Sequence, residues 1–85
     1  MPMFLIERQF AEVLELDGAA VAGVQRINAD VGVNWVYSFL SADRKKTYCL
    51  YEAPSAEAIR EAARRNGLPA DSVIEVSQLR PEAFA

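Results

Sequence analysis

The sequence predicts a small α+β domain whose segments follow the order strand, helix, strand, strand, helix, strand. Two observations predict this order. Four short segments are rich in the β-branched and aromatic residues that are typical of strands. Two other segments carry apolar residues at helical spacing behind a capping residue. Because the chain has only 85 residues, we expect one domain spanning residues 1–85.

The outer segments of the chain are expected to form its first and last strands. In residues 4–10 apolar and polar side chains alternate, which places Phe4 and Ile6 on one side and Glu7 on the other. Residues 73–79 are again rich in branched side chains and predict the last strand. The tail that follows would either stay loose or dock on a neighbouring molecule.

Two helices are expected, each with a capping residue at its start and a glycine at its end. Asp17 precedes a run with apolar residues three or four positions apart, and Gly32 ends that run. Ser55 precedes a second run, which ends at Gly67. The side chains of the second run that are expected in the core are Ile59, Ala62 and Ala63.

The two middle strands are expected to pair as an antiparallel hairpin. Residues 33–40 and 46–52 have strand character, and the connection between them is short and mostly polar. Simple alternation places one group of side chains on a common side of the first of these strands: Trp35, Tyr37 and Phe39. The pairing register stays open, because a shift of one residue reverses which of them share a face with Cys49 and Tyr51.

This order of elements is that of the ferredoxin-like fold, with four antiparallel strands in one sheet and both helices on one face. The second strand has apolar side chains on both of its sides, so neither side is suited to water. A second copy packing sheet to sheet would cover the open face and leave a space between the sheets. We therefore expect a homodimer of the dimeric α/β barrel type.

Composition excludes several classes of function. The net charge of −3 does not provide the basic surface of a nucleic-acid binder, so we expect no nucleic-acid partner. One cysteine excludes an internal disulfide. No apolar run approaches the roughly 18 residues of a membrane span, and charged residues interrupt the N-terminal segment before a signal peptide could form. We therefore expect a cytoplasmic protein with no membrane association.

The absence of histidine removes the usual general base and the commonest transition-metal ligand. The glycines match no phosphate-binding loop, and there is no paired-cysteine motif or nucleophile elbow. What remains is a set of polar and aromatic side chains on the strands, which we predict to line a pocket between the two sheets. The predicted ligand-binding residues are Glu7, Trp35, Tyr37, Cys49, Tyr51, Glu52 and Glu75.

Three functions are compatible with this set. The first is a dimer that binds a small molecule or a divalent metal. The second is a cofactor-independent enzyme of the monooxygenase or isomerase type, in which a glutamate with a pKa raised by desolvation transfers a proton. The third is a structural or interaction module. In that case the glutamates would face solvent or pair with Arg8 across the dimer, and Cys49 would be a small buried side chain.

Several segments together resemble a known bacterial family. They include FLIER at residues 4–8, residues 35–41 and 43–44, KTYCLYEAPS at residues 46–55, EAIR at 57–60, GLP at 67–69 and residues 75–76. The stretch 46–60 is the most specific part. On these residues the chain resembles the domain of unknown function 4242 family, small ferredoxin-like proteins of which some are labelled nickel-binding or nickel-responsive.

The resemblance implies a ferredoxin-like dimeric subunit with no established enzymatic activity, and nickel binding in some members. Metal binding in those members depends on histidine, which this chain lacks. The ligands that remain for a divalent metal here are three carboxylates and one thiolate: Glu7, Glu52, Glu75 and Cys49.

Overall fold

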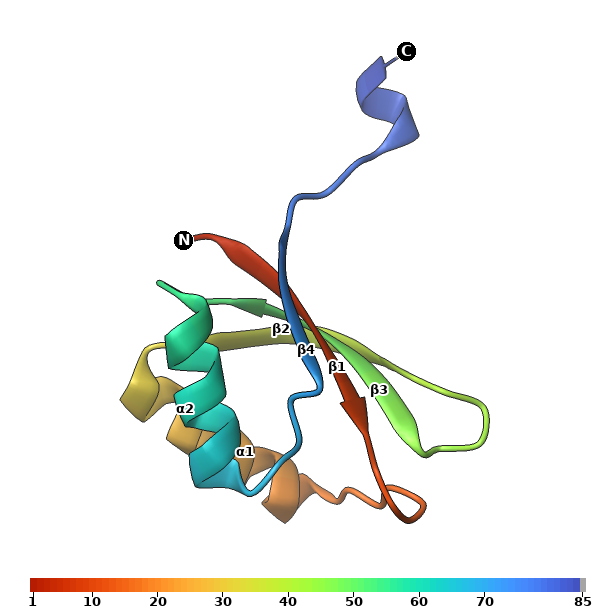
Figure 1. Ribbon diagram of the computed structural model, residues 1–85, viewed down its shortest axis with the longest axis vertical. Coiled ribbons are helices and arrows are strands. Elements are labelled where there is room, and N and C mark those ends of the chain that lie inside the picture. The colour runs from red at the N-terminus through yellow and green to blue at the C-terminus, as the bar shows by residue number, and fades with distance from the viewer. Residues whose placement is uncertain (85) are drawn as a thin grey trace.

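The computed structural model describes residues 1–84 and contains a four-stranded sheet with two helices (Figure 1). The elements are β1 (Met3–Gln9), α1 (Gly18–Val31), β2 (Asn34–Leu40), β3 (Lys46–Glu52), α2 (Ala56–Asn66), β4 (Ser72–Val76) and the 3₁₀ helix η1 (Pro81–Phe84). The strands lie in the order β2-β3-β1-β4, and all three neighbouring pairs are antiparallel. The predicted ferredoxin-like fold is therefore confirmed.

The helices begin and end at the predicted residues. The side chain of Asp17 accepts a hydrogen bond from the backbone N–H of Ala20 (2.8 Å), which satisfies one of the free donors of the first turn of α1. Ser55 caps α2 in the same way. Gly32 and Gly67 end the two helices with φ angles of 80° and 68°. These left-handed conformations are easily adopted by glycine because it has no Cβ.

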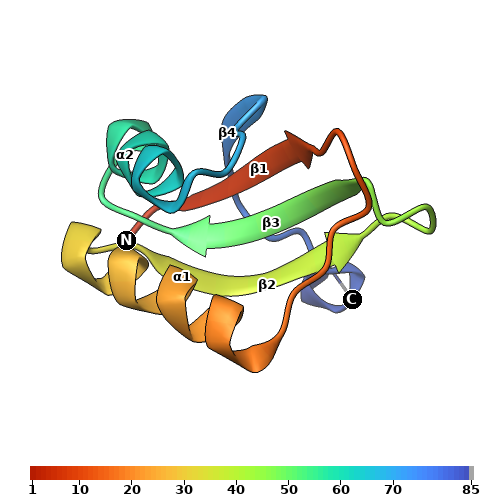
Figure 2. The same cartoon turned by 90° about the horizontal axis from the view of Figure 1, so that it is seen from below.

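Both helices cover the same face of the sheet, and the core lies between these two layers (Figure 2). Phe4 and Ile6 of β1 point toward the helices and are buried, whereas Glu7 points to the open face, as predicted. The predicted core residues of α2 are also buried against the sheet: Ile59, Ala62 and Ala63.

A β-bulge in β2 changes which side chains share a face. Trp35 pairs with Tyr51, but two residues later Tyr37 pairs with Leu50, so the register shifts between them. The extra residue turns Trp35 toward the helices, while Tyr37 and Phe39 lie on the open face. The prediction that these three aromatic side chains share one side was wrong, because simple alternation cannot anticipate a bulge.

The chain beyond β4 leaves the domain. The last strand ends at Val76, three residues earlier than predicted, and η1 stands apart from the sheet and helices in Figure 1. Leu79 and Phe84 on this tail are 79% and 74% exposed. The tail therefore presents apolar side chains that the rest of the described chain does not cover.

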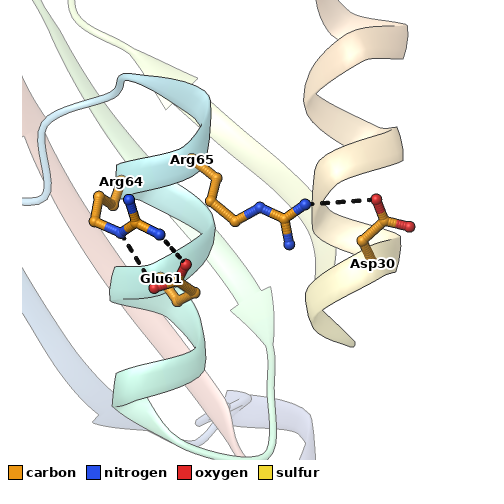
Figure 3. A network of polar contacts seen from close by, with 4 residues as sticks. All are labelled: Asp30, Glu61, Arg64 and Arg65. Atoms are coloured by element: carbon orange, nitrogen blue, oxygen red, sulfur yellow. Dashed lines mark hydrogen bonds and ion pairs between the residues drawn. The ribbon is translucent and has the colours of Figure 1, made fainter.

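Two ion pairs lie at the outer surface of the helices, one within α2 and one between α2 and α1 (Figure 3). Arg64 pairs with Glu61 within α2, and Arg65 reaches Asp30 of α1 at 3.7 Å. The basic pair near the end of α2 is thus occupied by surface carboxylates, as expected for charges at a helix C-terminus.

No helix within residues 1–84 is long and apolar enough to cross a membrane.

Candidate functional site

A cavity of about 140 Å³ lies on the helix-covered face of the sheet. It is bounded by the sheet, by α1 and by the segment that connects β1 to α1. Its lining is mostly hydrocarbon, and the aliphatic and phenyl side chains that contribute are Phe10, Leu14, Leu16, Val24, Leu40 and Leu68. A concave, mainly apolar space with a few polar groups is the usual form of a small-molecule site.

The segment between β1 and α1 is tied to the hairpin that joins β2 to β3. The backbone N–H of Phe10 donates to the carbonyl of Lys45, and that of Leu14 donates to the carbonyl of Arg44, both at 2.8 Å. Arg44 also donates from its guanidinium to the carbonyl of Leu14 (3.2 Å). In Figure 2 this segment passes the ends of β3 and β2 on its way to α1. These bonds hold Phe10 and Leu14 over the cavity.

Two aromatic rings form one wall of the cavity. Trp35 on β2 and Tyr51 on β3 are neighbours across the strands, with ring centroids 6.4 Å apart and planes within 8° of parallel. The bulge that turns Trp35 to this face also brings it near Ser38. The indole Nε1–H donates to the Ser38 hydroxyl at 2.8 Å, which fixes the orientation of the indole.

Arg8 lies beside these rings and is only 3% exposed. Its Nη1 donates to the carbonyl of Pro69 at 2.5 Å, and its guanidinium carbon is 5.8 Å from the centroid of the Tyr51 ring. The Tyr51 hydroxyl accepts a hydrogen bond from Asn28 (3.3 Å). Burial raises the pKa of Tyr51, and the contacts with Asn28 and Arg8 offset part of that rise. Tyr51 is therefore a neutral phenol at physiological pH.

Cys49 also lines the cavity and is 5% exposed. Its Sγ lies 3.5 Å from the Thr47 hydroxyl, to which it donates a weak hydrogen bond. A nucleophilic cysteine requires a base or a nearby cation that forms its thiolate. Arg8 is a cation that lines the same cavity, but the group bonded to Sγ is the Thr47 hydroxyl and no base, so Cys49 is described as a wall residue.

The structure brings three of the seven predicted site residues together. Trp35, Cys49 and Tyr51 line the cavity. Glu75 is exposed on β4, and although it pairs with Phe4 and so faces the helix side, it does not reach the cavity.

The other three predicted site residues, Glu7, Tyr37 and Glu52, lie on the open face. Two of them are carboxylates with partners on the same face. Glu7 forms an ion pair with Lys46 (2.9 Å), and Glu52 accepts a hydrogen bond from Asn34 (2.9 Å). The three glutamates thus do not converge on the cavity of one chain.

Sequence reasoning missed Arg8, Ser38 and Thr47, which supply polar groups to the cavity. For Arg8 a signal was present, since it follows Phe4 and Ile6 in steps of two and must share their buried face. For Ser38 there was no signal, because its face depends on the bulge. Thr47 lies two residues before Cys49 and so shares its side of the strand. Which face of the sheet that side forms depended on the hairpin register, which the sequence left open.

The donor groups do not fit a nickel centre within one chain. Among residues 1–84, no three histidine, cysteine, aspartate or glutamate side chains are grouped so that they could hold a metal ion. The sheet separates the potential ligands, with Cys49 on the helix side and Glu7 and Glu52 on the open side. Borderline metals such as nickel prefer nitrogen ligands, which the chain cannot supply from histidine.

Comparison with known proteins places the chain among small proteins of the same fold. The model of a family described as nickel responsive protein SCO4226-like matches residues 4–76. The crystal structure of SCO4226 from Streptomyces coelicolor is similar over 92% of this chain and 99% of that one, with a TM-score of 0.78 and 25% sequence identity. Among curated proteins, no sequence matches.

Proposed function

This chain belongs to the SCO4226-like family of nickel-responsive proteins, and within that family we propose that it binds a small organic molecule in the cavity beside Trp35 and Tyr51. The observation that carries this proposal is a cavity of about 140 Å³ whose walls are almost entirely hydrocarbon and aromatic. An apolar cavity of roughly 150 Å³ is large enough to bind benzene. The space can therefore hold a group about the size of one six-membered ring.

Binding is favoured over catalysis because of where the glutamates lie. The enzymatic alternative requires a desolvated carboxylate beside the substrate. Glu7, Glu52 and Glu75 do not line the cavity, and Cys49 has a hydroxyl rather than a base as its neighbour. The cavity therefore offers a substrate-sized space without a group suited to proton transfer.

The single tryptophan provides a direct test, because Trp35 lines the cavity. Benzyl alcohol, a neutral probe of suitable size, should change the Trp35 emission in a saturable way. Val24→Phe, which adds volume at the cavity wall, should abolish the response. Ala22→Phe on the exposed side of the same helix should keep it. A wild-type protein whose emission and titration heat do not respond to the probe would contradict the proposal.

We propose that nickel does not bind to a site within one subunit. Isothermal titration of the monomeric variant Tyr37→Ser with Phe39→Ser, using nickel chloride, should give no heat beyond dilution. This expectation follows from the absence of histidine and from the separation of the carboxylates and Cys49 by the sheet. A stoichiometric heat that Cys49→Ser removes would show that the thiol is a ligand after all.

We also propose that two copies associate through the open face of the sheet. This face carries exposed apolar side chains, with Phe39 at 63%, Ile74 at 55% and Tyr37 at 47% exposure. On this face the charges of Glu7 and Lys46 offset each other in an ion pair, and Glu52 accepts a hydrogen bond from the Asn34 amide. The apolar tail, which stands apart from its own domain in Figure 1, could reach a second copy.

Sedimentation velocity tests the association. The wild-type chain should sediment as a dimer at micromolar concentration, and Tyr37→Ser combined with Phe39→Ser should sediment as a monomer. Ala22→Ser on the outer face of α1 is the matched control and should remain dimeric. A monomeric wild-type protein would refute the proposed dimer and, with it, the predicted pocket between two sheets.

A further inference from the structure

The cavity contains a charge that the protein does not neutralise. Arg8 is 3% exposed, and its guanidinium carries a positive charge. Buried charges in proteins are normally paired with an opposite charge. The ion pairs found within residues 1–84 join Lys46 to Glu7, Arg64 to Glu61, and Arg65 to Asp30, and none of them includes Arg8.

The hydrogen bonds of Arg8 are also incomplete. A guanidinium has five N–H donors; in Arg8 one of them bonds to the carbonyl of Pro69, and the guanidinium also interacts with the Tyr51 side chain. In the described chain, no fully buried side-chain nitrogen or oxygen lacks a partner. Any guanidinium nitrogen of Arg8 without a partner therefore retains some accessible surface, and the space that Arg8 lines is the cavity.

Three of the residues that line the cavity carry hydroxyl groups. Ser38 accepts from the indole of Trp35, Tyr51 accepts from Asn28, and Thr47 accepts from the thiol of Cys49. Each hydroxyl oxygen thus accepts one hydrogen bond within the protein, and its O–H can still donate to another acceptor. Within the part of the chain that the structure describes, no carboxylate side chain lines the cavity, so these donors have no anionic partner there.

From this geometry we infer that the ligand is a small monocarboxylate with an apolar body, whose carboxylate pairs with Arg8 while its body lies against Trp35 and Tyr51. One cation in a hydrocarbon cavity matches one negative charge, and the planar guanidinium can bind both carboxylate oxygens. A fully polar anion would leave the apolar walls uncovered. This inference rests on the proposed function, since it requires that the cavity binds a small molecule.

Benzoate and benzamide distinguish the charge from the shape of the ligand. They are nearly equal in size, and only benzoate is an anion. Wild-type protein should bind benzoate about 10- to 100-fold more tightly than benzamide, because a hydrogen bond to a charged group is worth about 1.5–3 kcal/mol. Titration calorimetry and the Trp35 emission both report the two affinities. This comparison needs no variant, so it holds even if changes at Arg8 impair folding.

Variants then assign the effect to one side chain. Arg8→Met should remove the preference for benzoate while weak binding of benzamide persists. Arg8→Lys, which keeps a charge but loses the planar fork, should retain a reduced preference. Arg60→Met, at an exposed arginine of α2, is the matched control and should bind as the wild type does.

The possible outcomes separate the two proposals. Equal affinity for benzoate and benzamide in the wild-type protein would overturn the carboxylate assignment and leave the small-molecule site standing. A preference for benzoate that survives Arg8→Met would also overturn the assignment to Arg8. If neither probe binds and benzyl alcohol also fails, the small-molecule site itself is refuted.

Discussion

The two faces of the sheet are built from alternate residues of the same strands, yet they differ in burial. On the helix side, Phe4, Ile6 and Tyr51 are 5%, 0% and 2% exposed. On the open side, Phe39 and Ile74 are 63% and 55% exposed. Apolar content alone therefore does not decide burial in this domain. Each face is buried only if something packs on it, and the two helices of one chain can cover only one.

The polar groups of the two faces differ in a second way. On the open face, Glu7 is paired with Lys46, and Glu52 is bonded to Asn34. On the helix face, Arg8 has no carboxylate partner among the described residues. An open face on which Glu7 and Lys46 offset each other's charge is suited to contact with another sheet, and a buried arginine without a counter-charge is suited to an anionic ligand. The following predictions test this difference between the two faces, from the largest expected effect to the smallest.

The largest effect is expected from truncation of the core on the helix face. Ile6→Ala should lower the free energy of unfolding by about 2–5 kcal/mol, because it leaves a cavity at a fully buried position. Ile74→Ala on the open face should change it by no more than about 0.5 kcal/mol. Urea unfolding should be measured in the background of Tyr37→Ser and Phe39→Ser, so that association does not contribute. Similar losses of stability from Ile6→Ala and Ile74→Ala would contradict the proposed difference between the two faces.

Arg8→Met should raise the free energy of unfolding of the ligand-free protein by about 1 kcal/mol. The reason is that a buried charge without a counter-charge costs more than its hydrogen bond to Pro69 and its contact with Tyr51 return. Thermal and urea unfolding without added ligand measure this change. A clear loss of stability would mean that Arg8 is a structural residue whose charge the protein already compensates.

The pH dependence of stability should reveal the burial of Tyr51. Because burial raises the pKa of Tyr51 above its ordinary value of 10.0, the folded chain holds this proton more tightly than the unfolded chain. Its contribution is fully present below pH 10 and is lost as the pH rises through the higher pKa of the folded state. Tyr51→Phe should therefore reduce the fall in stability between about pH 9 and pH 11.

The control for this measurement is Tyr37→Phe, which alters a tyrosine of the open face and leaves Tyr51 in place. It should keep the fall in stability at alkaline pH. Urea unfolding at several pH values provides the slopes for both variants. Equal slopes for Tyr51→Phe and wild type would show that ionisation of Tyr51 is not linked to unfolding.

The smallest effect is expected from Glu7→Gln, which removes the ion pair with Lys46 on the open face. Partly exposed ion pairs contribute little and are screened by salt. The loss of stability should not exceed that of Ile74→Ala, and it should disappear in 1 M salt. Comparison with Arg8→Met is informative. Residues 7 and 8 are adjacent in sequence, but their two substitutions are expected to change the free energy of unfolding in opposite directions.

Much of the architecture followed from local patterns. The caps at Asp17 and Ser55 and the terminal glycines at positions 32 and 67 act through neighbouring backbone groups, so their effect is visible in a short stretch of sequence. The end of β4 was less predictable, because it depends on where pairing with β1 stops. Trp35, Cys49 and Tyr51 line a common cavity within one chain, on the helix-covered face of the sheet, whereas the predicted pocket between two sheets stays a prediction.

The sequence by itself determined the order of elements, the helix limits and the buried positions of β1 and α2, because these depend on period and on interactions within a few residues. Only the tertiary structure decided which face Trp35 occupies, since a single bulge in β2 reverses the alternation. The tertiary structure also decided that the Arg8 side chain lines a cavity and does not pair with a carboxylate. The position of Arg8 beside the cavity depends on three strands, a helix and a connecting segment that are distant in sequence. It also depends on how completely the side chains of these elements fill the space between them.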